Sequence, residues 1–372
     1  MKIIISREEL SQGVQTIQSA LSSRTTLPIL LNFLMETEGG KVKVVSTDLE
    51  MGVKHFLKAE IENDGSITIP AKKFADILHS LPEADEIELS VDSGGKVSLK
   101  CGRSRFGIVG APKSEYPILP DFNKASAFEL PAAVIGEMVR KTIFAASSDE
   151  TRHVLNGVFW SAKKGVLEMV STDGRRLAVM AKKIIPKDKE FSVIVPTKVL
   201  SEFLRLLGVL GIEDKSEENM SVAVTENQIT FQLKGTTLLS RLVGGSFPNY
   251  EQVIPTKREV IMTAPTKDLL AITKRAALCA VDRGGSVKYS LKKGVLHVNS
   301  SSQNNEFFEE LAIEYSGADF SVAFNPQFVV DALKHIDTDK TVIAMTSPVN
   351  PALFEPEKGE GDYRFVVMPM RL

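Results

Sequence analysis

The feature that most constrains this chain is a short phrase that occurs twice. Val45-Ser46-Thr47-Asp48 returns as Val170-Ser171-Thr172-Asp173, 125 positions later. In both copies apolar β-formers lead into a Thr-Asp turn, and the second copy runs on into another apolar stretch, a pattern typical of a β-hairpin. A single turn would not return with four residues intact. We therefore predict an internal repeat of about 125 residues, of which 372 residues hold about three copies.

A proline that opens an amphipathic helix supports three copies. Pro70, Pro196 and Pro326 each precede apolar residues at helical spacing, and proline suits a first helical turn because its missing N–H has no partner there. An acidic residue holds the same slot in all three helices: Asp76, Glu202 and Asp331. The first helix of each copy begins at a Ser6–Glu9 capping box, at Pro131 and at Pro265. The six predicted helices span residues 6–21, 70–81, 131–146, 196–208, 265–279 and 325–335.

Each predicted helix is followed by about three short strands, roughly eighteen in all, including 29–37 and 51–60. This order predicts an α+β fold of three similar domains, each with two helices packed on antiparallel sheets. Pro117 and Pro248 occur in similar linker-like stretches, where proline ends a strand ladder. We place the domain boundaries near 122 and 256, which gives domains of residues 1–122, 123–256 and 257–372.

Composition indicates an ordinary globular protein, with 43% hydrophobic and 25% charged residues. The net charge is −2, so any nucleic-acid partner requires basic residues to be segregated on one surface. Cys101 and Cys279 lie too far apart in sequence to suggest a disulfide framework, which favours a reducing, cytoplasmic location. The N-terminal isoleucines are too few for a signal peptide, and no apolar run is long enough to cross a membrane.

Neither a phosphate-binding loop nor metal-ligand spacing occurs in the sequence. Gly94-Gly95-Lys96 lacks the rest of a phosphate-binding loop, and the five histidines are not spaced as metal ligands, so we expect no cofactor and no metal. Asp48, Glu50 and Asp173 are the carboxylates on which a hydrolase could depend. A turn carboxylate that accepts from its own backbone is the simpler interpretation of these residues.

The predicted helices are more basic than the rest of the chain. Their charged residues sum to +4, which leaves −6 for the other segments. Few aromatic residues share the basic faces, so base stacking is not indicated. The pattern favours a helical layer that meets a polyanion through its backbone, without reading a base sequence. Random charge on six solvated helix faces is the alternative.

Seven stretches carry a resemblance to a known family, and together they cover the whole chain. The chain resembles the bacterial sliding clamps, the β subunits of DNA polymerase III. The stretches are Thr26-Leu27-Pro28-Ile29-Leu30, Thr47-Asp48-Leu49-Glu50-Met51, Gly102-Arg103-Ser104-Arg105-Phe106, Leu155-Asn156-Gly157, Thr172-Asp173-Gly174 with Arg176-Leu177-Ala178, Phe247-Pro248-Asn249-Tyr250 and Val366-Val367-Met368-Pro369-Met370-Arg371-Leu372.

The resemblance implies a ring of two chains, joined head to tail, that encircles duplex DNA and tethers the replicative polymerase without catalysis of its own. Helices would line the hole and sheets would form the outer wall, so the basic helix residues would face DNA. The candidate DNA-binding residues are Arg24, Lys72, Lys73, Arg140, Lys141, Arg152, Lys198, Arg205, Lys274 and Arg275.

The resemblance also implies a pocket between domains two and three, where the polymerase, the clamp loader and other partners dock a short peptide. Its expected residues are Leu155, Thr172, Gly174, Arg175, Arg176, Leu177, Pro248, Val253, Val349, Val367, Met368, Pro369 and Met370. Domain one of one chain would join domain three of the other. The residues expected at that dimer interface are Ile77, Leu81, Phe106, Leu278 and Cys279.

Two alternatives come from other classes. A carboxylate-dependent hydrolase would use Asp48, Glu50 and Asp173, and loss of a measured activity in Asp173→Asn would favour it. A scaffold protein unrelated to DNA would show neither polyanion binding nor the mass of a dimer.

Overall fold

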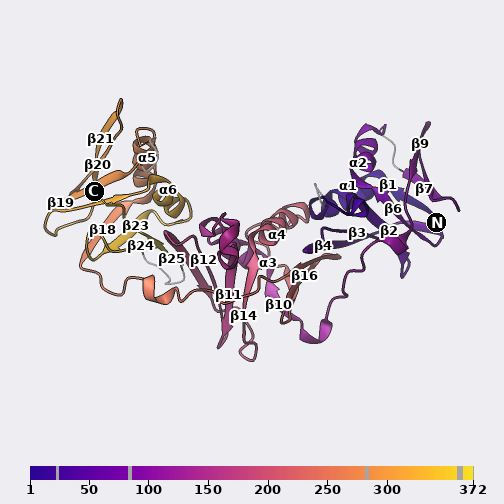
Figure 1. The fold of residues 1–372 in the computed structure, drawn as a ribbon, viewed down its shortest axis with the longest axis horizontal. Helices are drawn as coiled ribbons and strands as arrows, with labels where there is room; N and C mark the ends of the chain where they lie inside the picture. The colour runs from indigo at the N-terminus through magenta and orange to yellow at the C-terminus, as the bar shows by residue number, and fades with distance from the viewer. Residues whose placement is uncertain (22–24, 83–85, 281–284, 358–362, 372) are drawn as a thin grey trace. The chain divides into compact units, whose positions relative to one another are not determined.

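The computed structural model describes residues 1–21, 25–82, 86–280, 285–357 and 363–371. These residues form six α-helices and 25 strands (Figure 1). The chain divides into two compact units, residues 1–136 with 198–242 and residues 137–197 with 243–372. The helices are α1 (Arg7–Ile17), α2 (Ala71–Ser80), α3 (Ala132–Arg140), α4 (Thr197–Val209), α5 (Thr266–Ala277) and α6 (Pro326–Lys334).

Unit one holds two sheets. The five-stranded sheet has the order β5 (Glu60–Asn63), β1 (Lys2–Ser6), β7 (Glu86–Val91), β8 (Lys96–Cys101), β9 (Ser104–Val109). The eight-stranded sheet has the order β10 (Phe128–Pro131), β15 (Asn219–Val224), β16 (Gln228–Leu233), β17 (Thr236–Arg241), β4 (Met51–Leu57), β3 (Lys41–Thr47), β2 (Asn32–Glu38), β6 (Ser66–Pro70).

Unit two repeats this plan. Its eight-stranded sheet has the order β14 (Phe191–Pro196), β11 (Gly157–Lys163), β12 (Val166–Thr172), β13 (Arg176–Lys182), β25 (Tyr363–Val367), β24 (Ala352–Pro356), β23 (Lys340–Met345), β18 (Val260–Pro265). The four-stranded sheet has the order β21 (Glu306–Ala312), β20 (Val295–Ser301), β19 (Val287–Lys292), β22 (Phe320–Phe324).

Successive repeats share their large sheets. In unit one β17 pairs with β4, and in unit two β13 pairs with β25, so each eight-stranded sheet contains strands from two neighbouring repeats. All strand pairs among the described residues are antiparallel, which confirms the predicted α+β class. The sequence did not predict the shared sheets, because strand pairing across a repeat boundary leaves no local pattern.

A serine that binds the end of a helix confirms the threefold repeat. Ser46 Oγ donates to the carbonyl oxygen of Ile17, and Ser171 Oγ donates to that of Thr142. In the third repeat Ser300 Oγ donates to the carbonyl of Ala276 at 2.7 Å. The third copy was not predicted, because only the serine of the Val-Ser-Thr-Asp phrase is kept in the segment 299–302.

The six helices lie where they were predicted, and all ends except the last residue of α4, Val209, fall inside the predicted bounds. The helix predicted over 131–146 ends at Arg140, and a 3₁₀ turn follows at Ile143–Ala145. The strand predicted over 29–37 begins at Asn32, because a 3₁₀ turn that starts at Pro28 precedes it. The predicted strand 51–60 is wrong as a single element and divides into β4 and β5.

The predicted capping box at α1 is half correct. Ser6 accepts a hydrogen bond from the Glu9 N–H at 3.1 Å, as an N-cap should. The Glu9 carboxylate does not complete the reciprocal box; its Oε1 accepts from the backbone N–H of Lys58 at 2.8 Å. This long-range bond ties α1 to the chain just after β4.

Two histidines, the buried His55 and the half-buried His335, lie where repeats join within a unit. On β4, His55 Nδ1 lies 2.8 Å from the hydroxyl of Thr236 on β17. Just past α6, the His335 ring stacks on Phe144 with ring centroids 4.0 Å apart. Burial lowers the pKa of both imidazoles, against the opposing charges of Glu9 near His55 and Asp331 near His335.

We therefore expect the free energy of unfolding to fall as the pH drops below about 6.5, the usual histidine value. Below that pH the unfolded chain binds more protons than the folded chain, so stability that is present above it is lost. Each histidine contributes a slope of at most about 1.4 kcal/mol per pH unit. Urea unfolding between pH 7.5 and 5.5 measures the slope. The double variant His55→Gln/His335→Gln should show a shallower slope, and an equal slope in both proteins would contradict the assignment.

Candidate peptide-binding site

The residues expected to bind a peptide all lie in unit two. The centre of the expected site is the tight turn between β12 and β13. Asp173 Oδ1 accepts from the N–H groups of Arg175 at 2.9 Å and Arg176 at 3.0 Å. Thr172 Oγ1 accepts from Gly174 N–H and donates to the carbonyl of Arg176. Gly174 has φ +86°, which favours glycine. Asp173 is therefore a turn residue, as predicted.

The C-terminal segment continues β25 along this turn. Val367 pairs with Arg176, and the Met368 N–H donates to the Arg175 carbonyl at 2.9 Å. The Met370 N–H donates to the carbonyl of Ala323 at 2.8 Å. These bonds hold the tail in an extended conformation, with 38% of Met368 exposed and Pro369 and Met370 half-buried.

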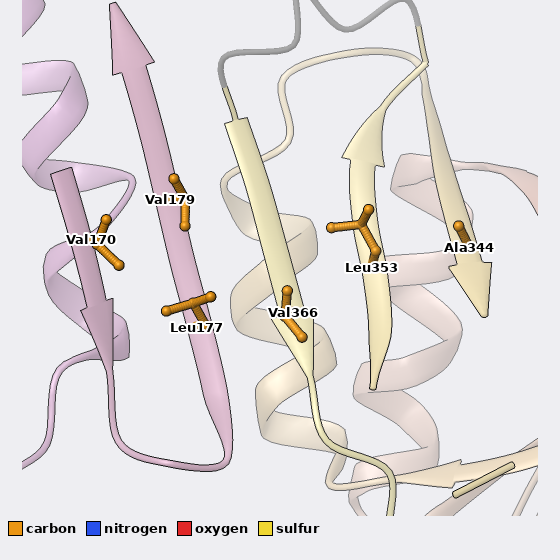
Figure 2. Packing of buried hydrophobic residues seen from close by; sticks show 6 residues of the cluster. All are labelled: Val170, Leu177, Val179, Ala344, Leu353 and Val366. Carbon is orange, nitrogen blue, oxygen red and sulfur yellow. The ribbon is translucent and has the colours of Figure 1, made fainter. Parts of the chain in front are cut away.

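Three of the predicted pocket residues belong to the core. Leu177 is 2% exposed and packs in a cluster with Val170, Val179, Ala344, Leu353 and Val366. Figure 2 shows these side chains on neighbouring strands of the eight-stranded sheet. Leu155 and Val367 are buried as well. These three side chains belong to the core under the turn and the tail and are not accessible to a ligand. The exposed part of Met368 is accessible.

A segment over residues 246–254, which we call the strap, packs against the same core cluster through Phe247, Tyr250 and Ile254. Phe247 stacks on Phe159 of β11 with ring centroids 5.1 Å apart, and Tyr250 packs at the same place. The Tyr250 hydroxyl donates to Glu168, which also receives a bond from Arg364 at 3.1 Å. The anchored strap leaves Pro248 and Val253 exposed. Val349, before β24, is 70% exposed.

The two arginines of the turn have different surroundings. Arg175 is exposed. The Arg176 side chain is 13% exposed, and its guanidinium bonds to Asp173, to Asp331 and to the carbonyl of Phe144. Arg176 therefore faces the protein interior, although the resemblance implied a residue of the pocket.

Unit one contains the first copy of the turn and serves as an internal comparison. Asp48 Oδ1 accepts from Glu50 and Met51 N–H groups, as Asp173 does in unit two. The Arg241 N–H donates to the Glu50 carbonyl at 2.9 Å, where Met368 meets Arg175 in unit two. The Arg241 and Glu50 side chains also approach to 3.7 Å. The backbone hydrogen bond is thus the same in both units, but the side chains differ. Arg241 and Glu50 form a charged pair in unit one, whereas Met368 is the residue at the place of Arg241 in unit two.

The basic residues predicted to bind DNA differ in their exposure and in their acidic neighbours. Lys72 and Lys73 of α2, Arg140 of α3 and Lys274 of α5 are exposed, whereas Arg24 lies outside the described residues. Five others have acidic neighbours in the fold. These are Lys141 with Glu137 and Asp337, Arg152 with Asp149, Lys198 with Asp48, Arg205 with Glu202, and Arg275 with Glu309. Asp337, Asp48 and Glu309 lie outside the predicted helices, so the net charge of +4 on the helices overstates the positive field at their surface.

The predicted dimer residues also divide into two groups. Ile77 and Leu81 are buried in unit one, at 6% and 5% exposure. Phe106 lies half-buried on β9, an edge strand of its sheet. In unit two Leu278 is 73% exposed and Cys279 is half-buried. An exposed edge strand with apolar side chains is suited to pairing with another chain.

Two further apolar residues on edge strands were missed by the sequence analysis. Val109 on β9 is 76% exposed, and Phe308 on β21 is 57% exposed. Phe308 stands in an alternating strand next to Glu309 and Glu310. Exposed and half-buried residues alternate along β21, and Phe308 lies on the exposed face of the strand.

Within the ranges that the structure describes, no three His, Cys, Asp or Glu side chains gather in a group that could hold a metal ion. None of the helices in that part of the chain is long and apolar enough to span a membrane.

Comparison with known proteins gives a match over nearly the whole chain. Residues 1–120, 129–249 and 251–371 match the N-terminal, central and C-terminal domain families of the DNA polymerase III beta subunit. The beta sliding clamp of Chlamydia pneumoniae is 32% identical over 375 residues, which cover 100% of this chain and 99% of the relative. That of Escherichia coli is 31% identical, with both chains covered completely.

Solved structures agree with this match. The DNA polymerase sliding clamp from Bacillus subtilis superposes with a TM-score of 0.95 at 28% identity, covering 100% of this chain and 99% of that one. The DnaN sliding clamp from Pseudomonas aeruginosa, solved bound to griselimycin, gives 0.94 at 30% identity, with both chains covered completely.

Proposed function

The chain belongs to the bacterial DNA polymerase III beta subunit family, the beta sliding clamps, and we propose that two copies close head to tail into a ring that slides on duplex DNA. Members of this family are non-catalytic processivity factors, with DNA and the polymerase as partners. The match of three consecutive domains over nearly the whole chain carries this conclusion. The hydrolase alternative loses its support, because Asp48 and Asp173 are occupied by turn N–H groups.

A ring explains how a protein of net charge −2 can work on DNA. A protein held by phosphate contacts alone needs many cations, and its affinity falls steeply with salt. A ring is retained by topology, so a few weak contacts from exposed residues such as Lys72, Lys73 and Lys274 suffice. Contacts to phosphates carry no base sequence, which allows sliding.

We further propose that partner peptides dock in unit two, between the 172–177 turn, the 246–254 strap and the C-terminal tail. The exposed apolar side chains of Met368, Val253 and Val349 suit an extended peptide. The replicative polymerase and the clamp loader are the expected partners. Because these partners act on chromosomal DNA, we infer a cytoplasmic location for the protein. We also propose domain boundaries near residues 122 and 256.

The ring predicts a dimer in solution. Light scattering at micromolar concentration should give the mass of two chains. Leu278→Asp should shift the mass toward one chain, because a charge placed in an apolar interface is costly to desolvate. Ile118→Asp is a matched control, since Ile118 is 94% exposed on a linker stretch. A wild-type mass of one chain would argue strongly against the ring.

A further inference from the structure

We propose that Asp331 of α6 is a positioning residue for the peptide site, acting through the guanidinium of Arg176. The inference rests on the proposed peptide-binding function of unit two. No direct contact between Asp331 and the peptide is required. Asp331 instead holds the residue on which both the turn and the tail of the site depend.

Arg176 joins three segments that are far apart in sequence. Its Nε donates to Asp173 Oδ2 at 3.0 Å, within the turn. One terminal nitrogen donates to Asp331 Oδ2 at 2.6 Å, and the other donates to the carbonyl of Phe144 at 2.8 Å. The guanidinium also lies over the ring of Phe328, 4.7 Å from its centroid. The planar fork of arginine is thus held from several sides, which lysine could not reproduce.

Asp331 is itself held in place. Its Oδ1 accepts from Gln327 Nε2 at 2.7 Å, while Oδ2 takes the bond from Arg176. Its backbone carbonyl lies 2.7 Å from His335 Nδ1, and that histidine stacks on Phe144. The Asp331 side chain is 17% exposed. A partly desolvated carboxylate with both oxygens bonded gives Arg176 a fixed direction.

The position of Arg176 connects this link to the peptide site. Arg176 begins β13 and pairs with Val367, and the neighbouring Arg175 carbonyl accepts from Met368 N–H. Movement of Arg176 would therefore displace the turn and the tail together. A site that is already held in its binding conformation loses less free energy to ordering when a ligand docks.

Unit one contains a matched link without the proposed pocket. Glu202 of α4 occupies the slot of Asp331 and bonds to Arg205, which donates to the carbonyls of Thr16 at 2.7 Å and Gln15 at 3.1 Å. A helix carboxylate is again joined through a guanidinium to the end of a first helix. Here the arginine comes from α4 itself and not from a turn, so this link should have no effect on peptide binding.

The test is a set of peptide titrations with full-length protein. The probe is a fluorescent synthetic peptide with the clamp-binding segment of a replicative polymerase. Asp331→Asn and Arg176→Met should each weaken binding by about 10-fold or more, within the usual 5–150-fold range of coupling between sites. The double variant should be no weaker than Arg176→Met, because both changes break one link. Asp331→Glu, which keeps the carboxylate, should recover most of the affinity.

Glu202→Gln is the control for a purely structural effect. It should lower the urea midpoint of unfolding yet leave peptide affinity within about 2-fold of wild type. If Asp331→Asn does not fold, Gln327→Ala removes only the neutral donor to Asp331 and should weaken binding by about 2- to 5-fold. Wild-type affinity in a folded Asp331→Asn or Gln327→Ala protein would overturn the inference about Asp331 and leave the proposed peptide site standing. Failure of the wild-type protein to bind the peptide would instead overturn the proposed function of the site.

Discussion

Protein loaded on a nicked circular DNA should remain bound until the circle is cut, and should then leave through the new ends. A ring is held because a closed circle has no end, not because its contacts are strong. The salt dependence follows from the same argument. Retention on the circle should change little between 50 and 200 mM salt, whereas a protein that depends on six to ten phosphate contacts would lose about 10³- to 10⁵-fold in affinity.

Gel filtration of labelled protein with the DNA, before and after cutting, measures this retention. A linear DNA whose two ends are blocked by tightly bound proteins is the control, and it should retain the protein as the circle does. Continued retention on open linear DNA would indicate site binding and would contradict the ring. Strong loss from the intact circle at 200 mM salt would contradict it as well.

Removal of residues 368–372 should abolish peptide binding and leave the dimer intact. The deletion removes the exposed Met368 side chain and the hydrogen bond from its N–H to the Arg175 carbonyl. Loss of a central apolar anchor typically costs 2 kcal/mol or more, and several contacts are lost here, so we expect at least about a 100-fold loss in affinity. Fluorescence anisotropy with the polymerase peptide measures the affinity.

Light scattering on the same sample shows whether the dimer persists. The candidate interface residues Phe106 and Leu278 lie outside the deleted segment. Arg371→Ala is the matched control, because Arg371 is an exposed tail residue with no assigned part in the pocket. Unchanged peptide affinity in the shortened protein would eliminate the pocket assignment.

The repeat and the helices could be predicted because their causes are local. A turn carboxylate accepts from N–H groups two and three residues ahead, so the roles of Asp48 and Asp173 were readable from four adjacent letters. A helix face repeats every three or four residues, which is also within reach of a short window. The ends of elements were predicted less exactly, because some of them depend on distant residues. Lys58, the residue just after β4, donates its N–H to Glu9, which is 49 positions away.

The residues of the peptide site came from a family resemblance, and their individual roles could not be read in that way. Arg175 and Arg176 are neighbours of the same type, yet one is exposed and the other is enclosed by Asp173, Phe144 and Asp331. The difference arises because Arg175 lies in the exposed turn, whereas Arg176 begins β13 with its side chain turned toward Phe144 and Asp331. Which face is interior depends on the segments that cover it.

The sequence by itself determined the threefold repeat, the six helices, the α+β class and the chemistry of the two turns. Only the tertiary structure decided that neighbouring repeats share a sheet, that Ile77 and Leu81 are buried, and that Lys141 and Lys198 have acidic partners far away in sequence. The physical reason is range. Turn bonds and helix periodicity join residues a few positions apart, whereas Arg176 and Asp331 meet across 155 positions, and only the packed fold brings them together.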